Sequence, residues 1–198
     1  DLNLITFKEK NILIKIINIL KFLFKLQPMQ LGYFYSDDID EFIKKNYYNF
    51  DLIFFQSLRV TQYHCPSDYK KKYLDMGDLY SSNYLQTSRS KNFFNPLKYI
   101  YLFESMLIKK YEKICFKKFD KIFLFSKKEV KTVNKFEEKI EQINYGIDKI
   151  KKKFKYSNDN NKIIFVGNIT YLPNRDACKY FIKNVFPKVI IKDPSIEF

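Results

Sequence analysis

The chain has 198 residues, of which 46% are hydrophobic and 29% charged, so its composition excludes a disordered chain and predicts a globular protein. Its formal net charge is +14, which excludes an acidic protein and leaves open a lysine-rich surface or attraction to anionic lipids or nucleic acid. The three cysteines, Cys65, Cys115 and Cys178, lie far apart and form no C-x-x-C pair, which argues against a zinc site and a disulfide framework and favours a cytoplasmic location.

The first elements follow from the spacing of apolar residues. Residues 2–7 roughly alternate apolar and polar side chains, which predicts a strand. The segment 12–26 is apolar apart from polar residues at every third or fourth position, which predicts one polar face on a helix. These polar residues are Lys15, Asn18, Lys21 and Lys25. We expect the apolar face to pack on a sheet, with an interfacial membrane helix as the alternative, because the segment is too short and too charged to span a bilayer.

Strands and helices then alternate along the chain. Strands are expected at 31–35, 51–56, 72–76, 120–125 and 139–143, and helices at 37–45, at 96–116 and after the capping sequence 126–129. This alternation predicts an α/β fold with a doubly wound parallel sheet. We expect a first domain over 1–150, a polar linker over 151–161 and the beginning of a second domain over 162–198. Both ends of the chain are interpreted as truncated.

Polar residues follow two of the predicted strands and are candidates for a binding site. Arg59 comes after the strand 51–56, and Asp78 and Ser81 come after the strand 72–76. Ligands of open parallel sheets bind outside the carboxyl ends of the strands, so these side chains are expected near a ligand. Arg59 would contact an anion or form a surface ion pair, and Asp78 would approach a substrate hydroxyl or cap the next helix. Glu112, which lies among lysines, is expected to form an ion pair along its helix.

The second domain opens on a pattern that is typical of phosphate binding. Residues 163–166 form a short apolar run, as in a buried parallel strand, and Gly167-Asn168 follows directly. Asn174 is expected to cap a helix that begins at Arg175. A glycine turn that leads into a capped helix presents backbone N–H groups to an anion.

The residues around this turn also resemble a known family. The sequence FVGNI-x-Y-x-PN-x-DA over 165–177 resembles the opening of the nucleotide-sugar domain in retaining glycosyltransferases of the GT-B fold. The likeness is greatest to family-four transferases of exopolysaccharide and cell-surface glycan pathways. The pattern D-x-x-D-x-x-S over 75–81 is similar to a signature of their acceptor domain, and Glu104 and Glu112 match their pattern on the long helix. The turn NYGID at 144–148 resembles their entry into the interdomain linker.

The resemblance implies a GT-B glycosyltransferase that transfers a sugar, of the hexosyl class, from a nucleotide-sugar to a glycan or a lipid-linked acceptor, without a bound cofactor or metal. It implies a catalytic role for Asp78, acceptor binding by Arg59 and Ser81, and contact of Gly167 and Asn168 with the donor diphosphate. Gly77 stands where many relatives have a histidine, which puts a histidine-assisted mechanism in doubt. With only one strand and one helix of the donor domain, residues 1–198 are expected to be inactive alone.

Two other functions remain open at this point. A GT-B-like nucleotide-sugar epimerase would share the fold and need no acceptor. A non-enzymatic basic module would bind nucleic acid or an anionic surface and would gather lysines and aromatic residues on one face. Because the lysines are spread along the whole chain, no nucleic-acid partner is expected. A peripheral contact with the inner face of an anionic membrane stays an alternative to a purely cytoplasmic location.

Overall fold

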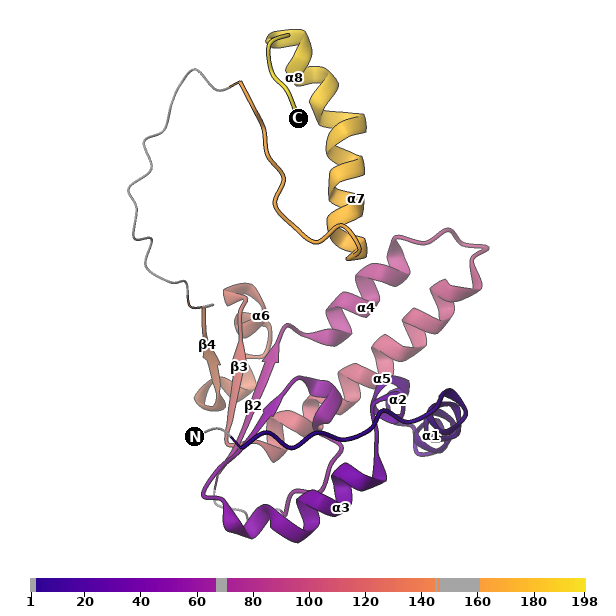
Figure 1. The fold of residues 1–198 in the computed structure, drawn as a ribbon, viewed down its shortest axis with the longest axis vertical. Coiled ribbons are helices and arrows are strands. Elements are labelled where there is room, and N and C mark those ends of the chain that lie inside the picture. The colour runs from indigo at the N-terminus through magenta and orange to yellow at the C-terminus, as the bar shows by residue number, and fades with distance from the viewer. Residues whose placement is uncertain (1–2, 67–70, 145, 147–160) are drawn as a thin grey trace. The chain divides into compact units, whose positions relative to one another are not determined.

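The computed structural model describes residues 3–66, 71–144, 146 and 161–198 (Figure 1). The chain forms two compact units, Asp1–Gly146 and Ile147–Phe198, which are described separately below. Apart from Asn161, the expected linker lies outside the described residues, as do three of the five residues of the turn at 144–148. The expected domain boundary at residue 150 therefore stays a prediction.

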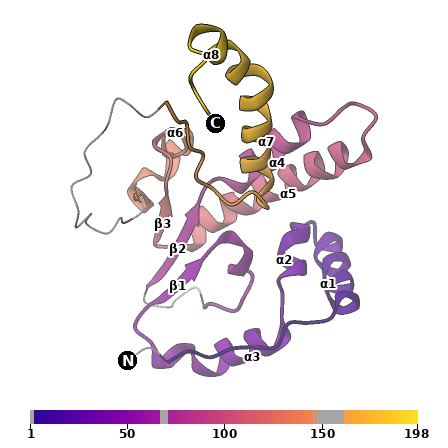
Figure 2. The same ribbon diagram turned by 45° about the horizontal axis from the view of Figure 1, so that its top comes forward.

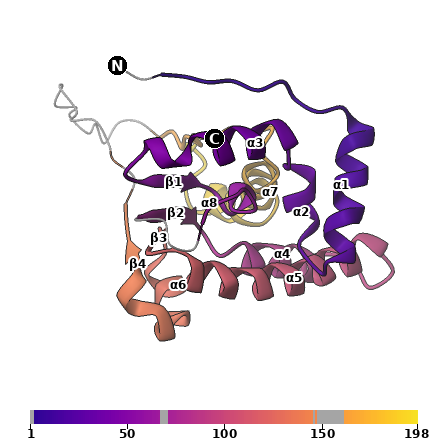
Figure 3. The same cartoon turned by 90° about the horizontal axis from the view of Figure 1, so that it is seen from below.

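The first unit contains six helices and four strands within its described residues. In chain order they are α1 (Ile12–Phe24), α2 (Met29–Tyr33), α3 (Asp37–Asn46), β1 (Ile53–Gln56), β2 (Lys72–Gly77), α4 (Tyr80–Arg89), α5 (Pro96–Lys118), β3 (Lys121–Leu124), α6 (Lys127–Thr132) and β4 (Ile140–Gln142). Short 3-10 helices span Tyr47–Asn49, Leu58–Val60 and Asn134–Lys139. The helices α4 and α5 form a hairpin, and α1 lies beside α2 at the opposite end of the unit from β3 (Figures 2 and 3).

The four strands form one parallel sheet in the order β1-β2-β3-β4, which confirms the predicted α/β class. The register aligns Phe55, Leu74, Ile122 and Ile140 in one row across the sheet, and all four side chains are buried. These residues join one hydrophobic core with side chains of the long helix α5, namely Ile108, Tyr111, Cys115 and Phe116. The carboxyl ends of all four strands therefore lie along one edge of the sheet.

The opposite face of the sheet is only partly covered. Phe54, Tyr73 and Phe123 project to this face, where the Phe123 ring lies 6.3 Å from Phe54 and 6.2 Å from Tyr73 between ring centroids. Phe54 keeps 51% of its surface exposed. Burial alternates along β1, as in a strand with one open face.

Two of the strands predicted in the first unit are absent from its described residues. Residues 3–7 form no strand, and 31–35 belongs largely to the helix α2. The aromatic residues of this segment suit a strand locally, but a distant carboxylate stabilises the start of a helix. Glu104 of α5 accepts hydrogen bonds from the backbone N–H groups of Met29 (2.9 Å) and Gln30 (3.1 Å), two groups that have no partner within α2.

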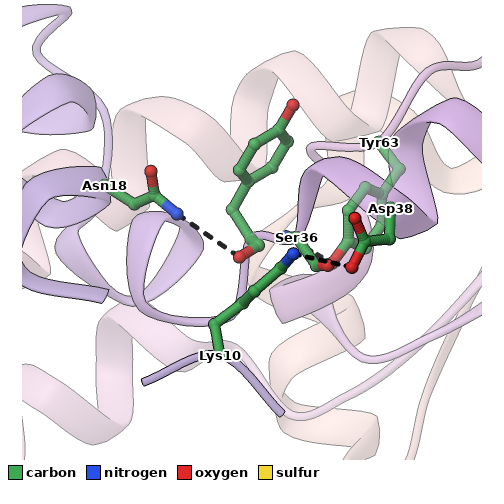
Figure 4. A network of polar contacts seen from close by, with 6 residues as sticks. Lys10, Asn18, Ser36, Asp38 and Tyr63 are labelled. Atoms are coloured by element: carbon green, nitrogen blue, oxygen red, sulfur yellow. Dashed lines mark hydrogen bonds and ion pairs between the residues drawn. The ribbon is translucent and has the colours of Figure 1, made fainter. Parts of the chain in front are cut away.

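Helix α1 forms where it was predicted, but the burial of its side chains follows the prediction only in part. Lys21 and Lys25 are exposed as expected, whereas Lys15 and Asn18, also predicted to face solvent, are only 9% and 4% exposed. The Asn18 amide donates to the Tyr35 carbonyl oxygen at 3.5 Å (Figure 4), and the Lys15 ammonium pairs with Glu9 and lies 4.5 Å from the centre of the Tyr33 ring. Phe22 packs against the hydrophobic core, but most of the apolar side chains of α1 stay exposed, so the predicted packing of the whole apolar face on the sheet is wrong.

Gly32 makes this close approach of α1 and α2 possible. A Cβ atom at Gly32 would lie only 2.6 Å from the backbone oxygen of Asn18 and 2.8 Å from the Cα of Ile19. Both contacts are with backbone, so no side-chain rotation could relieve them. A residue with a side chain at position 32 would force α2 away from α1.

The second unit contains α7 (Leu172–Tyr180), a π-helical turn (Phe181–Val185) and α8 (Phe186–Lys192). Residues 163–166 form no strand beside the isolated parallel bridge between Lys162 and Glu197 in the described part of this unit. Ile164 and Val166 are 80% and 90% exposed, so the predicted buried strand is wrong. The helix begins at Leu172 rather than at Arg175, since Pro173 suits its first turn. The predicted cap at Asn174 is therefore wrong, and this residue lies inside α7.

Substitution of Gly32 tests the packing of α1 on α2. We expect G32A to lower the free energy of unfolding by about 1–3 kcal/mol, because the clash with the Asn18 backbone exceeds the gain in helix propensity. Urea unfolding followed by circular dichroism measures the change. The control is G146A, because an added Cβ at Gly146 meets no atom within 4 Å. A G32A variant as stable as G146A would contradict the backbone contact.

Candidate functional site

The first part of the candidate site lies directly after β1. Ser57 has a φ angle of 91°, a left-handed conformation that is costly for a residue with a side chain. Its hydroxyl lies 2.9 Å from the Tyr80 hydroxyl at the start of α4 and accepts a hydrogen bond from the backbone N–H of Arg59 at 3.2 Å. Ser57 therefore ties the loop after β1 to the loop after β2.

Arg59 is half-buried between these two loops and α2. Its guanidinium carbon lies 5.5 Å from the centre of the Tyr80 ring and 5.0 Å from that of Phe34. Its Nε donates to the side-chain oxygen of Gln30 at 3.2 Å. No carboxylate forms an ion pair with Arg59 in the part of the chain that the structure describes. The expected alternative of a surface ion pair therefore finds no partner there, and the cation is held in place by neutral groups.

Asp78 follows β2 and is exposed. The preceding Gly77 has a φ angle of 72°, and a Cβ there would lie 3.0 Å from the Phe125 ring, so this position favours glycine over histidine. Leu79 rather than Asp78 occupies the N-cap position of α4, and it makes no side-chain cap. The helix-capping alternative for Asp78 is therefore wrong. Among the described residues, nothing hydrogen-bonds to or forms an ion pair with the Asp78 carboxylate.

Ser81 is buried and bound to the long helix rather than facing open space. Its hydroxyl donates to Glu112 Oε2 at 2.6 Å, and its backbone N–H donates to Oε1 at 3.0 Å. Glu112 is only 3% exposed, so the expected ion pair with neighbouring lysines was wrong. Acceptor binding by Ser81 stays a prediction, but its hydroxyl proton already has a protein acceptor.

Three carboxylates thus bind backbone N–H groups near the candidate site. Glu104 binds the start of α2, Glu112 binds the first turn of α4, and Glu129 accepts from the Leu79 N–H at 3.1 Å. Burial raises the pKa of Glu104, Glu112 and Glu129 above the usual glutamate value, while the hydrogen bonds that each receives oppose this shift. The charge of Asp78 further raises the pKa of Glu129, which indicates that these two carboxyl groups are close.

Two cavities lie near these residues. A groove of about 260 Å³ is lined by Ile19, Met29, Gln30, Tyr33, Phe34, Tyr84 and Glu104. It shares Gln30 and Phe34 with the surroundings of Arg59, so the candidate cation lies beside it. A larger cavity of about 620 Å³ lies among α4, α5 and α6, and its lining includes Ser81, Glu112 and three lysines (Lys109, Lys113 and Lys131). Neither Arg59 nor Asp78 lines the larger cavity, so the predicted site residues do not converge on it.

Gly167 and Asn168 lie in the second unit and form a compact turn. The Asn168 side-chain oxygen accepts hydrogen bonds from Thr170 N (2.9 Å) and Oγ1 (2.7 Å), and its backbone oxygen accepts from the Asn174 amide at 3.1 Å. A Cβ at Gly167 would lie 2.9 Å from that amide nitrogen, so glycine permits the close approach. Contact of Gly167 and Asn168 with a donor diphosphate stays a prediction.

In comparisons with known proteins, no family model matches the chain, and no curated protein or solved structure matches it. Within the described ranges, no helix is both long and apolar enough to cross a membrane. Those same ranges contain no group of three or more histidine, cysteine, aspartate or glutamate side chains placed to hold a metal ion.

Sequence reasoning missed the contribution of Gln30 to this site. Its side-chain oxygen orients Arg59, but Gln30 lies directly before the segment 31–35, which was predicted as a strand rather than as a helix. Tyr80, by contrast, could be expected near the site because it follows β2 closely in the sequence. No local pattern identifies Gln30, since its position depends on the capping of α2 by Glu104.

The pH dependence of stability tests the buried state of Glu112. Because its folded pKa is raised, its contribution to stability is complete below the unfolded value and is lost as pH rises through the folded pKa. We expect E112Q to become more stable relative to the wild type as pH rises from about 4 to 8, because glutamine stays neutral while the buried glutamate ionises. The control E138Q replaces an exposed glutamate and should follow the wild-type profile. A pH-independent difference for E112Q would contradict the burial of this carboxyl group.

Proposed function

We propose that the chain is part of a GT-B glycosyltransferase that transfers a sugar from a nucleotide-sugar to a glycan or lipid-linked acceptor. In this proposal the first unit supplies the acceptor side, and the second unit begins the domain that binds the donor. The parallel sheet of the first unit and the placement of Arg59 and Asp78 after neighbouring strands are compatible with such an arrangement. The resemblance of residues 75–81 and 165–177 to these enzymes supplies the choice of reaction.

The proposal rests on two charged side chains at one edge of the sheet, neither of which forms an ion pair within the described residues. Arg59 follows β1 and Asp78 follows β2, which is the strand next to β1. The Ser57–Tyr80 contact joins their loops, and Ser57 adopts a strained backbone conformation of the kind that gathers at functional sites. A cation and a carboxylate that form no ion pair within the described chain are suited to bind a substrate that has both anionic and hydroxyl groups.

The proposed roles follow from the chemistry of these groups. Arg59, held by Gln30 and Tyr80, would bind an anionic group of the acceptor in a fixed orientation. Asp78 would accept a hydrogen bond from the acceptor hydroxyl and align its oxygen with the anomeric carbon of the donor. The backbone of Gly167 and Asn168 would lie against the donor diphosphate, whose negative charge grows as the sugar–phosphate bond breaks.

The test is an assay of the protein expressed from the whole of its gene, with common nucleotide-sugars and with glycan and lipid-linked acceptors. We expect D78N to lower kcat by about 10²–10⁴-fold, because the acceptor hydroxyl loses its carboxylate partner. We expect R59K to raise the KM for an anionic acceptor by about tenfold or more, because lysine cannot reproduce the planar stacking and the Nε–H contact. The matched control is R89K, which changes an exposed arginine at the end of α4.

Other outcomes would contradict the proposal. Interconversion of the nucleotide-sugar without transfer to an acceptor would indicate an epimerase. Unchanged kinetics of both D78N and R59K would remove the candidate site. Residues 1–198 alone are expected to show no transfer, and turnover by this segment would contradict the proposed division between the acceptor and donor sides.

A further inference from the structure

The outer face of α1 is an apolar stripe without a partner among the described residues. It follows helical spacing and comprises Ile12, Leu13, Ile16, Ile17, Leu20 and Phe24. Ile17 and Leu20 are 51% and 50% exposed, and Phe24 at the end of the helix is 90% exposed. A helix of a globular protein normally turns such a stripe toward the core, but here the polar contacts of Lys15 and Asn18 occupy the inner face.

The stripe is held outward by fixed packing and not by fraying of the helix. Asn11 caps the first turn by accepting from the Ile14 N–H at 3.1 Å. The backbone of α1 rests on Gly32 of α2, and Lys10, just before the helix, pairs with Asp38 at 2.6 Å (Figure 4). The contacts with Gly32, Tyr33 and Tyr35 determine which face of α1 points inward, so rotation of the helix to bury the stripe would break them.

The charges around the stripe complement an anionic surface. The helix α1 contains no acidic residue, and its exposed Lys21 and Lys25 flank the end of the stripe near Phe24. The whole chain has a net charge of +14. An apolar stripe bordered by lysines on a short surface helix is the pattern of helices that lie in the plane of a membrane, with apolar residues among the acyl chains and lysines at the headgroups.

We propose that α1 binds the surface of a membrane that contains anionic phospholipids and inserts the stripe from Ile12 to Phe24 into it. The helix lies on the membrane and does not cross it, in keeping with the absence of a span-capable helix from the described ranges. This proposal does not depend on the transferase activity. Lys21 and Lys25 supply the selectivity for anionic lipid, and the stripe supplies the part of the binding that persists in salt.

Sedimentation with vesicles tests the proposal. We expect the protein to sediment with vesicles of phosphatidylglycerol and phosphatidylcholine, and at least tenfold less well with phosphatidylcholine alone. The double variant I17E/L20E should bind at least tenfold more weakly, because two exposed apolar residues become charged. The matched control is I114E, which changes an isoleucine that is 49% exposed on α5. Replacement of Lys21 and Lys25 by alanine should weaken binding to the anionic vesicles by roughly fivefold per lysine.

A fluorescent residue gives a second readout that does not depend on affinity. The chain has no tryptophan, so F24W introduces a single reporter at the end of the stripe. We expect a blue shift of its emission with the anionic vesicles. The comparison variant F94W places tryptophan at a residue that is 93% exposed in the loop between α4 and α5, where other apolar side chains are also exposed. Its emission should shift less than that of F24W.

Several results would overturn the proposal. The proposal would be wrong if the wild type did not sediment with the anionic vesicles, or if I17E/L20E bound them as well as the wild type does. It would also be wrong if I114E lost as much vesicle binding as I17E/L20E. A blue shift confined to F94W would assign membrane contact to the α4–α5 loop instead. A wild type that forms dimers, becomes monomeric in I17E/L20E and does not bind vesicles would identify a second copy as the partner of the stripe. Circular dichroism of each variant verifies that the fold is retained.

Discussion

The arrangement of the first unit depends on carboxylates that cap helices from a distance. Glu104 and Glu112 both project from α5, and each accepts backbone N–H groups from the beginning of a different helix. Neither α2 nor α4 has a side-chain cap of its own. A negative charge at the positive end of a helix is favourable, and it also satisfies donors that would otherwise be buried without partners. The long helix therefore determines where two shorter helices begin.

The capping of α2 and α4 also affects the candidate site, because both helices contribute residues to it. The helix α4 brings Tyr80 to Ser57 and Arg59, and α2 brings Gln30 to Arg59. Burial opposes the ionised form of each capping glutamate, whereas the hydrogen bonds it receives favour that form. The geometry around Arg59 therefore depends on two buried carboxyl groups that lie far from it in the sequence.

The sequence predicted what depends on local periodicity and failed where distant contacts decide. The strands that became β1, β2, β3 and β4 and the long helix α5 were located closely, because their apolar runs and end signals agree. The segment 31–35 was assigned to a strand since nothing nearby reveals its cap on Glu104. Lys15 and Asn18 were expected on the exposed face of α1 because amphipathic spacing identifies two faces but not which of them contacts protein. Arg59 and Asp78 could be chosen from their positions after strands, whereas Gln30 could not.

The glycine at position 32 matters for the surroundings of Arg59 as well as for the packing of α1. Because it has no Cβ, the backbone of α2 lies directly against Asn18 and Ile19 of α1. Gln30 lies two residues earlier on the same short helix and accepts a hydrogen bond from Nε of Arg59. A side chain at position 32 that forced α2 away from α1 would therefore also move an acceptor that orients the guanidinium.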